Sequence, residues 1–260
     1  MDQIKWLQTS LNALGLNPPV PEDGEPNAHT RTAVVWFQGK YGLPLTGLAS
    51  GDTQRALKSA LESPESVSFP KVVGVCVHGL GNDVLGIGAG MDNLAIELNK
   101  KSRCRFSVFD HANSPWEVAD TNRPVIDTYL SGASEGGAKI VYVGHSLGAG
   151  LGIDIANGFS LRGITVSLLV PVDPVQWKSN TSQPGVWAIS ANVEVAECFR
   201  QNAYPGGGQI VKANGNTSTK LENQTLLKYD HIALGSAREV HDWCSQAVDK
   251  LVATPSQPEA

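Results

Sequence analysis

The chain has 260 residues, of which 41% are hydrophobic and 17% are charged, and its formal net charge is −5. This length and composition are typical of a folded, turn-rich protein with one large domain, or with one medium and one small domain. The acidic balance argues against nucleic-acid binding, and because no apolar run reaches the roughly 18 residues that span a bilayer, we expect no stable membrane insertion.

Residues 4–61 have the pattern of short amphipathic helices. Apolar residues recur at spacings of three and four over residues 4–14, and Gly15 is typical of a helix C-cap. Three short helices over this length predict a small helical bundle, which we assign to residues 1–62. The second predicted helix has Thr30 as its N-cap and ends at Gly42, and the third has Asp52 or Thr53 as its N-cap and ends at Leu61.

A series of short motifs runs through this segment: Leu7-Gln8, Leu11-Asn12-Ala13-Leu14-Gly15, Asp23-Gly24, Thr30, Ala33-Val34, Phe37-Gln38, Tyr41-Gly42-Leu43, Thr46-Gly47, Thr53 and Ala56-Leu57. The series resembles the peptidoglycan-binding-type-1 domain, a three-helix bundle found on many cell-wall hydrolases. It departs from that family at 24–27, where the family usually has Gly-x-Phe/Tyr-Gly. The resemblance implies that residues 1–62 bind peptidoglycan or another cell-envelope polymer. The alternative is a bundle without affinity for the wall.

From residue 71 onward, short β-rich runs alternate with longer stretches that are compatible with helices. Nearly continuous apolar runs are typical of parallel strands that are covered on both faces. We therefore predict an α/β sheet domain over residues 71–254, joined to the bundle by a linker over 63–70 and followed by a tail over 255–260. The predicted strands are 71–77, 105–109, 139–143, 164–170, 186–189, 193–199 and 209–212, and the predicted closing helix is 236–251.

The third predicted strand runs directly into Gly144-His145-Ser146-Leu147-Gly148. A serine between a strand and a helix makes a sharp, strained turn, and the flanking glycines leave room for it. Such a turn lifts the hydroxyl above the sheet, at the positive end of the following helix. We interpret Ser146 as the nucleophile of a serine hydrolase. The alternative is a glycine-rich turn without chemistry.

The first predicted strand ends in His78-Gly79-Leu80-Gly81, which matches the His-Gly motif that precedes the oxyanion loop of α/β-hydrolases. Acyl transfer places negative charge on the carbonyl oxygen, and two backbone N–H donors stabilise it. We predict the N–H groups of Leu80 and Leu147 as these donors, with Gly81 as the alternative to Leu80. His78 is interpreted as a residue that braces the loop.

The base and the acid follow the nucleophile in this fold. Of the two downstream histidines, His231 lies in a predicted loop and His241 lies inside the predicted closing helix, so we favour His231 as the base. In many relatives the acid follows the second strand after the nucleophile, but residues 200–205 contain no carboxylate. Asp173 follows the end of a buried strand, where catalytic groups of open α/β sheets gather. We predict Asp173 as the acid, and the alternative is a turn-forming Asp-Pro pair.

Residues 71–254 thus resemble a compact α/β-hydrolase, and the two-part layout is similar to that of mycobacteriophage lysin B esterases. These enzymes usually have an aromatic residue and Gln where this chain has His145 and Leu147, so mycolate specificity is not implied. We predict a serine carboxylic-ester hydrolase that works through an acyl-enzyme on an ester or lipid of the bacterial envelope, as a phage lysis enzyme would. The alternatives are a peptidoglycan amidase or peptidase with the same triad, and a non-catalytic wall-binding protein.

The cysteines and the first residues bear on cofactors and location. The four cysteines include no Cys-x-x-Cys pair, which argues against a zinc cluster, and Cys76 is predicted to be a buried free thiol. We expect no metal or cofactor. Residues 1–6 lack the basic start and apolar core of a secretory signal. We therefore expect synthesis in a cytoplasm and action at a bacterial envelope, which is the host wall if a phage encodes the protein.

Overall fold

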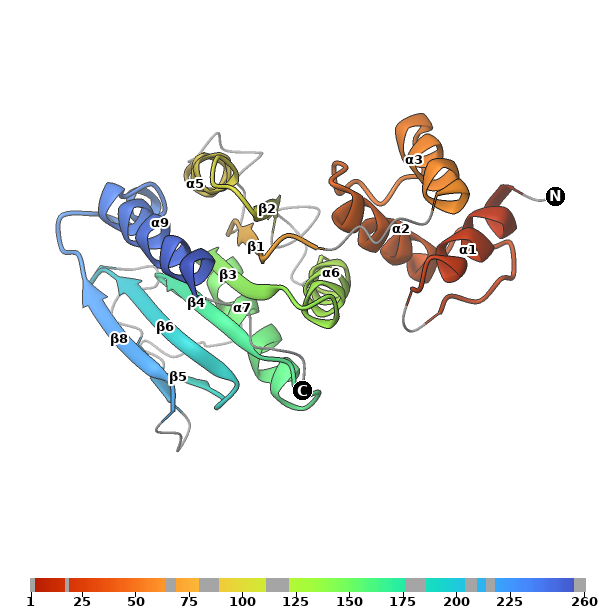
Figure 1. Ribbon diagram of the computed structural model, residues 1–260. Coiled ribbons are helices and arrows are strands. Elements are labelled where there is room, and N and C mark those ends of the chain that lie inside the picture. The colour runs from red at the N-terminus through yellow and green to blue at the C-terminus, as the bar shows by residue number, and fades with distance from the viewer. Residues whose placement is uncertain are drawn as a thin grey trace. The chain divides into compact units, whose positions relative to one another are not determined.

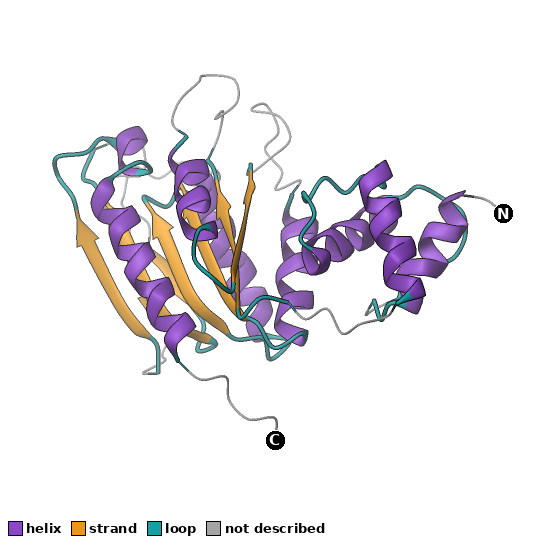
Figure 2. Cartoon of the chain, turned by 45° about the horizontal axis from the view of Figure 1, so that its top comes forward, coloured by secondary structure: helices purple, strands orange, loops and turns teal. Residues whose placement is uncertain are grey.

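The computed structural model describes residues 3–16, 19–63, 69–79, 89–110, 122–175, 186–203, 210–213 and 218–254. The chain forms two compact units, one of Met1–Phe69 with Pro124–Gly136 and the other of Pro70–Arg123 with Gly137–Ala260. The first unit is helical, and the second contains the strands (Figures 1 and 2). The prediction of an α/β sheet domain preceded by a small helical bundle is confirmed.

The helical unit is built from α1 (Gln3–Ala13), α2 (Ala28–Tyr41), α3 (Gly51–Glu62) and α6 (Arg123–Glu135). Its core contains the buried side chains of Leu7, Leu11, Phe37 and Leu57. Helix α6 belongs by sequence to the segment after β2, yet it packs closely on α2. A Cβ atom on Gly39 of α2 would lie 2.3 Å from the Tyr129 ring of α6, so only glycine permits this approach.

Two predicted helix caps are wrong, and one stop is confirmed. Helix α2 begins after Asn27, whose side chain accepts a hydrogen bond from the N–H of Thr30, and α3 begins after Ser50, which accepts from Thr53. Asparagine and serine are both strong N-caps, and the threonines lie three residues further in, where their N–H groups need that acceptor. Gly42 ends α2 in a left-handed conformation with φ 73°, as predicted.

The bundle repeats one hydrogen-bonded arrangement twice. Buried Gln8 on α1 accepts from the N–H of Gly24 and donates to the hydroxyl of Thr30. Buried Gln38 on α2 accepts from Gly47 and donates to Thr53 in the same way. Both glycines have positive φ, 80° and 67°. Each glutamine therefore ties the loop after its helix to the first turn of the next helix, which satisfies buried polar groups on both sides.

The main sheet of the second unit has six strands in the order β2-β1-β3-β4-β6-β8, and every neighbouring pair is parallel. Two further strands, β5 and β7, pair with each other in parallel. The strands are β1 (Val72–Val77), β2 (Cys104–Phe109), β3 (Lys139–His145), β4 (Val166–Val172), β5 (Val186–Ile189), β6 (Val193–Arg200), β7 (Ile210–Ala213) and β8 (Lys220–Thr225).

Helices cover both faces of this sheet. On one face, α5 (Gly90–Asn99) and α9 (Arg238–Ala253) pack against strand residues that include Val141 and Val143. On the other face, α7 (Leu147–Ser160) packs so closely that a Cβ atom on Gly152 would lie 2.2 Å from the Tyr142 ring. Alternation along β3 thus buries both faces of the strand. No helix in the described ranges is long and apolar enough to cross a membrane.

The predicted strands all form, with ends shifted by one or two residues, but β8 was missed. Its sequence is polar, Lys-Leu-Glu-Asn-Gln-Thr, and most of its side chains are exposed, because it is an edge strand of the main sheet. The last strand before His231 is therefore β8. His231 itself opens a one-turn helix, α8 (His231–Leu234), where a loop was predicted.

Candidate active site

The predicted site residues gather at the carboxyl ends of the parallel strands. β3 ends at His145 and leads into Ser146, β4 ends just before Asp173, and β8 leads through residues 226–230 to His231. β1 and β3 are neighbours, and β2 lies on the outer side of β1. Strand order therefore reverses between β1 and β3, and open α/β sheets bind their ligands at such a switch point.

Ser146 occupies a strained turn between β3 and α7. Its φ is 58° and its ψ is −122°, a conformation that costs a non-glycine residue about 1–3 kcal/mol. The surrounding glycines have a steric reason. A Cβ atom on Gly148 would lie 2.5 Å from the His78 carbonyl oxygen, and one on Gly79 would lie 2.5 Å from the Ser146 Cβ atom. Because these two positions lack side chains, the backbone after β1 can lie this close both to Ser146 and to the first turn of α7.

Backbone hydrogen bonds hold the serine in this turn. The N–H of Ser146 donates to the carbonyl of Val172 at 2.9 Å, at the end of β4. Its carbonyl accepts from Val175 at 3.1 Å and from Ala149, in the first turn of α7, at 3.1 Å. The nucleophile candidate is thereby tied to β4 and to α7. These bonds offset the strain of the turn.

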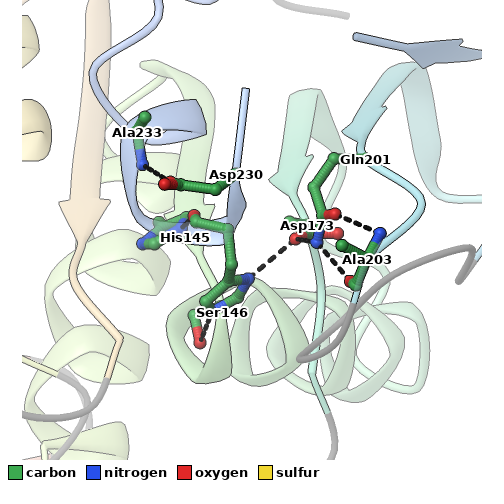
Figure 3. Close-up of polar contacts among 8 residues, drawn as sticks. His145, Ser146, Asp173, Gln201, Ala203, Asp230 and Ala233 are labelled. Atoms are coloured by element: carbon green, nitrogen blue, oxygen red, sulfur yellow. Dashed lines mark hydrogen bonds and ion pairs between the residues drawn. The ribbon is translucent and has the colours of Figure 1, made fainter. Parts of the chain in front are cut away.

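The three side chains predicted as a triad are connected by two hydrogen bonds, both of them made by His231. Ser146 Oγ is 2.9 Å from His231 Nε2, and His231 Nδ1 is 2.7 Å from Asp173 Oδ2. Figure 3 labels Ser146 and Asp173, the two residues that these hydrogen bonds of His231 connect. Because the carboxylate can only accept, Nδ1 carries the proton, and Nε2 is left to accept from the serine hydroxyl. Ser146 is 8% exposed and Asp173 is fully buried.

Asp173 is held by groups from β6. Its backbone has a positive φ of 46°, and its N–H donates to the Phe199 carbonyl at 2.6 Å. The side-chain amide of Gln201, just past the end of β6, donates to Asp173 Oδ2 at 2.6 Å (Figure 3). Residues 200–205 contain no carboxylate, which pointed to Asp173, but nothing in the sequence pairs the neutral Gln201 with that acid.

His145 is a second residue that sequence reasoning missed. Its Nε2–H donates to the backbone carbonyl of His231 at 2.7 Å, and the centroids of the two rings are 4.9 Å apart. Burial, and next the nearby His231, lower the pKa of His145 to about 4. His145 is therefore neutral at pH 7 and supports α8 from β3. Its position beside the predicted nucleophile was visible in the sequence, but its partner 86 residues away was not.

The remaining predicted residues take the following places. Leu147 is the first residue of α7, so its N–H is among the first-turn amides that have no partner inside the helix. Leu80 and Gly81 lie outside the described residues. His78 contacts Asp92 on α5, with 2.9 Å between Nε2 and Oδ2, and His241 contacts the Gly235 carbonyl rather than Ser146.

The cysteines stand apart from this chemistry. Cys76 is a buried free thiol, as predicted, and burial raises its pKa well above the ordinary value. Cys104, Cys198 and Cys244 are also free. Within the ranges that the structure describes, no cluster of three His, Cys, Asp or Glu residues could hold a metal ion.

Comparison with known proteins gives one family match and several structural likenesses. The family model of a putative peptidoglycan binding domain matches residues 1–57. No curated protein matches the chain. A solved structure from work on LipS and LipT, two metagenome-derived lipolytic enzymes, is 12% identical with a TM-score of 0.47, covering 72% of this chain and 96% of the other. Est1E from Butyrivibrio proteoclasticus is 10% identical with a TM-score of 0.43, covering 73% and 92%.

The class of protein rests on the family match and on the chain's own topology. A parallel sheet, a strained serine between its central strand β3 and helix α7, and an acid and a histidine that follow in that order define the α/β-hydrolase fold. The chain therefore combines a domain of the peptidoglycan-binding type at its N-terminus with an α/β-hydrolase fold.

Proposed function

We propose that the protein is a serine carboxylic-ester hydrolase that acts on the bacterial cell envelope. The observation that carries the proposal is the continuous chain of hydrogen bonds from Ser146 Oγ through His231 to buried Asp173, at 2.9 and 2.7 Å. These distances lie within the range that general-base catalysis needs. The order of the three groups matches the roles of nucleophile, base and orienting acid.

In the proposed mechanism, Ser146 Oγ attacks the ester carbonyl while His231 Nε2 takes the hydroxyl proton. Asp173 keeps the Nδ1 proton in place and stabilises the imidazolium that forms. His231 then gives its proton to the leaving alcohol, and an acyl-enzyme remains on Ser146. Water, activated by the same imidazole, hydrolyses this ester and releases the acid, which restores the serine hydroxyl.

We place the oxyanion hole at the N-terminus of α7 and at the loop after β1. The N–H of Leu147 follows the nucleophile directly, and helix α7 adds its positive end. The second proposed donor is the N–H of Leu80, which follows Gly79. Support for this assignment is the close approach of Gly79 to Ser146, because it brings the backbone that leads to Leu80 next to the nucleophile. Each such donor is worth roughly 100- to 1000-fold in rate.

The proposed location rests on the family match over residues 1–57. A wall-binding domain on the same chain raises the local concentration of the hydrolase at its substrate, which suits an ester or lipid of the envelope. The resemblance to the lysin B esterases extends the proposal to a phage lysis enzyme that acts on the host wall.

Hydrolysis of p-nitrophenyl esters of graded acyl length tests the activity. We expect the wild type to release p-nitrophenol and Ser146→Ala to lose roughly a million-fold in kcat, the scale known for a triad nucleophile. Ser160→Ala, at the other end of helix α7, is the matched control and should keep wild-type rates. Hydrolysis that survives Ser146→Ala would reject the mechanism, and faster cleavage of p-nitroanilides than of the esters would point to an amidase instead.

Co-sedimentation with purified sacculi tests the location. The full chain carrying Ser146→Ala is used, so that binding is measured without turnover. We expect it to sediment with sacculi and to remain in solution with cellulose particles of equal mass. If the supernatants from the sacculi and from the cellulose particles contain equal amounts of the protein, the wall-binding part of the proposal is rejected and the hydrolase part is unaffected.

A further inference from the structure

Gln201 stands where many relatives of this fold carry the catalytic acid. It directly follows β6, the second strand of the main sheet after helix α7, and it lies at the same end of the sheet as Asp173. Gln201 is 1% exposed, although an amide is costly to bury without hydrogen bonds. The structure gives it those bonds.

The amide of Gln201 has one defined orientation. Nε2 donates to Asp173 Oδ2 at 2.6 Å and to the Ala203 carbonyl at 2.7 Å, and Oε1 accepts from the Ala203 N–H. The turn at Ala203 therefore fixes which end of the amide faces Asp173: both donor contacts require the NH₂ group there. A glutamine held in this way presents a donor to the carboxylate.

Asp173 Oδ2 receives both the Gln201 amide and His231 Nδ1, at 2.6 and 2.7 Å. Among the residues that the structure describes, the other oxygen, Oδ1, has no hydrogen-bond partner. The orientation of this buried carboxylate thus depends on the two bonds to one oxygen. Without Gln201, rotation about the Cβ–Cγ bond would exchange the two oxygens or tilt Oδ2 away from the imidazole.

We propose that Gln201 is a positioning residue of the triad, whose amide holds Asp173 Oδ2 against His231 Nδ1. The proposal rests on the esterase function proposed above. In this chain the acid, Asp173, lies at the end of β4, and the position after β6 carries a neutral hydrogen-bond donor instead of a carboxylate. A carboxylate in place of the amide, 2.6 Å from Asp173, would repel it, and the repulsion between like charges raises the pKa of one of the two groups.

Two substitutions at this position separate positioning from simple structural support. Gln201→Met keeps the volume and removes the donor, so kcat for p-nitrophenyl butyrate should fall about 10- to 100-fold at every pH, with KM within about twofold of wild type. Gln201→Glu can replace the donor only while its carboxyl group is protonated. Its kcat relative to wild type should therefore be highest near pH 6 and should fall as pH rises.

The control is Gln224→Met. Gln224 on β8 also donates its amide to a buried carboxylate, that of Glu197, but it does not touch the triad. It should keep wild-type kcat. Among the described residues, other titratable or charged side chains in the region of the triad include His145 on β3, Cys198 and Arg200 on β6, His78 after β1 and Asp230 before α8, and both Gln201 variants retain them. Comparing each variant with wild type at the same pH cancels their titration.

The proposal is overturned if folded Gln201→Met keeps kcat within twofold of wild type, or if the ratio of Gln201→Glu to wild type does not change between pH 6 and pH 9. Circular dichroism and the thermal midpoint establish folding, and if the Met variant does not fold, the pH dependence of the Glu variant decides. Loss of activity in Ser146→Ala together with an unchanged Gln201→Met rejects only this inference. Full activity in Ser146→Ala rejects the esterase mechanism itself.

Discussion

Two of the three residues of the proposed triad hold backbone angles that L-amino acids rarely adopt. Among the described residues, positive φ values outside glycine occur only at Arg103, Ser146 and Asp173. Such conformations persist when the surroundings fix them, and they cluster at functional sites. Here the N–H of each of these two residues is bonded to a carbonyl near the end of a neighbouring strand, Val172 for Ser146 and Phe199 for Asp173. The main sheet therefore supplies the interactions that hold both residues in place.

The lowered pKa of His145 predicts a pH-dependent stability. Its pKa is about 4 in the folded protein against an ordinary value of 6.5, so below pH 6.5 the unfolded chain binds more protons than the folded one. The contribution of His145 to stability is complete above pH 6.5 and is lost as pH falls toward 4. Between pH 7 and pH 5 the wild type should lose about 2 kcal/mol more unfolding free energy than His145→Gln, measured by urea denaturation.

Glutamine is the chosen replacement at residue 145 because it does not titrate and can still donate to the His231 carbonyl. The comparison removes the effect of all other titrating groups, which both proteins share. Parallel curves of unfolding free energy against pH for the two proteins would contradict this account of His145.

Sequence patterns point to residues whose own chemistry is visible in a motif, and not to residues whose proposed role depends on a contact. Ser146, Asp173 and His231 were predicted from an elbow motif, a strand end and chain order, and the structure brings these three together. Gln201 belongs to no catalytic motif, and only its hydrogen bond to Asp173 in the structure draws attention to it. Periodicity and motifs carry no information about such pairs, because they are made by the packing of distant strands.

At the scale of elements, helix α7 offers a sharp test of why the elbow needs glycine. Gly148→Ala places a Cβ atom 2.5 Å from the His78 carbonyl and 2.6 Å from that of Val77, both on backbone that cannot easily move. We expect a loss of about 1–3 kcal/mol in unfolding free energy, together with loss of esterase activity.

Gly158→Ala in the same helix is the matched control, since a Cβ atom there would meet nothing within 4 Å. Alanine is a better helix former than glycine, so the unfolding free energy of this variant should rise by about 0.5–1 kcal/mol and its activity should not change. Urea denaturation of both variants measures the difference. Equal unfolding free energies for Gly148→Ala and Gly158→Ala would contradict the close contact between Gly148 and the carbonyl groups of Val77 and His78.

The repeated glutamine arrangement makes a prediction for the helical unit. Gln8→Ala removes the acceptor of the Gly24 N–H and the donors to Asp23 and Thr30, which leaves buried polar groups without partners. We expect the free energy of unfolding of this unit to fall by about 2 kcal/mol. The rates of amide hydrogen exchange in α1 and α2 should therefore rise about 30-fold. Gln3→Ala, on the exposed first turn of α1, should leave exchange unchanged, and equal rates in the two variants would contradict the proposed role.

For the whole molecule, hydrophobic pattern was enough to predict the fold class, because central parallel strands such as β1 and β4 are buried throughout. The same rule failed for β8, whose polar side chains reflect its place at an edge. The packing of α6 within the helical unit was equally beyond the sequence. It depends on paired glycines and aromatic rings, Gly39 with Tyr129 and Gly132 with Trp36, that lie far apart in the chain.

The central claim is that Ser146 is an activated nucleophile, and reaction with an alkyl fluorophosphonate tests it without knowledge of the natural ester. Serine Oγ displaces fluoride at phosphorus, and His231 takes the hydroxyl proton. Intact-mass spectrometry should find one phosphonyl group per chain, peptide mapping should place it on Ser146, and Ser146→Ala should remain unmodified. A wild-type chain that gains no adduct, or an adduct that persists in Ser146→Ala, would contradict the account.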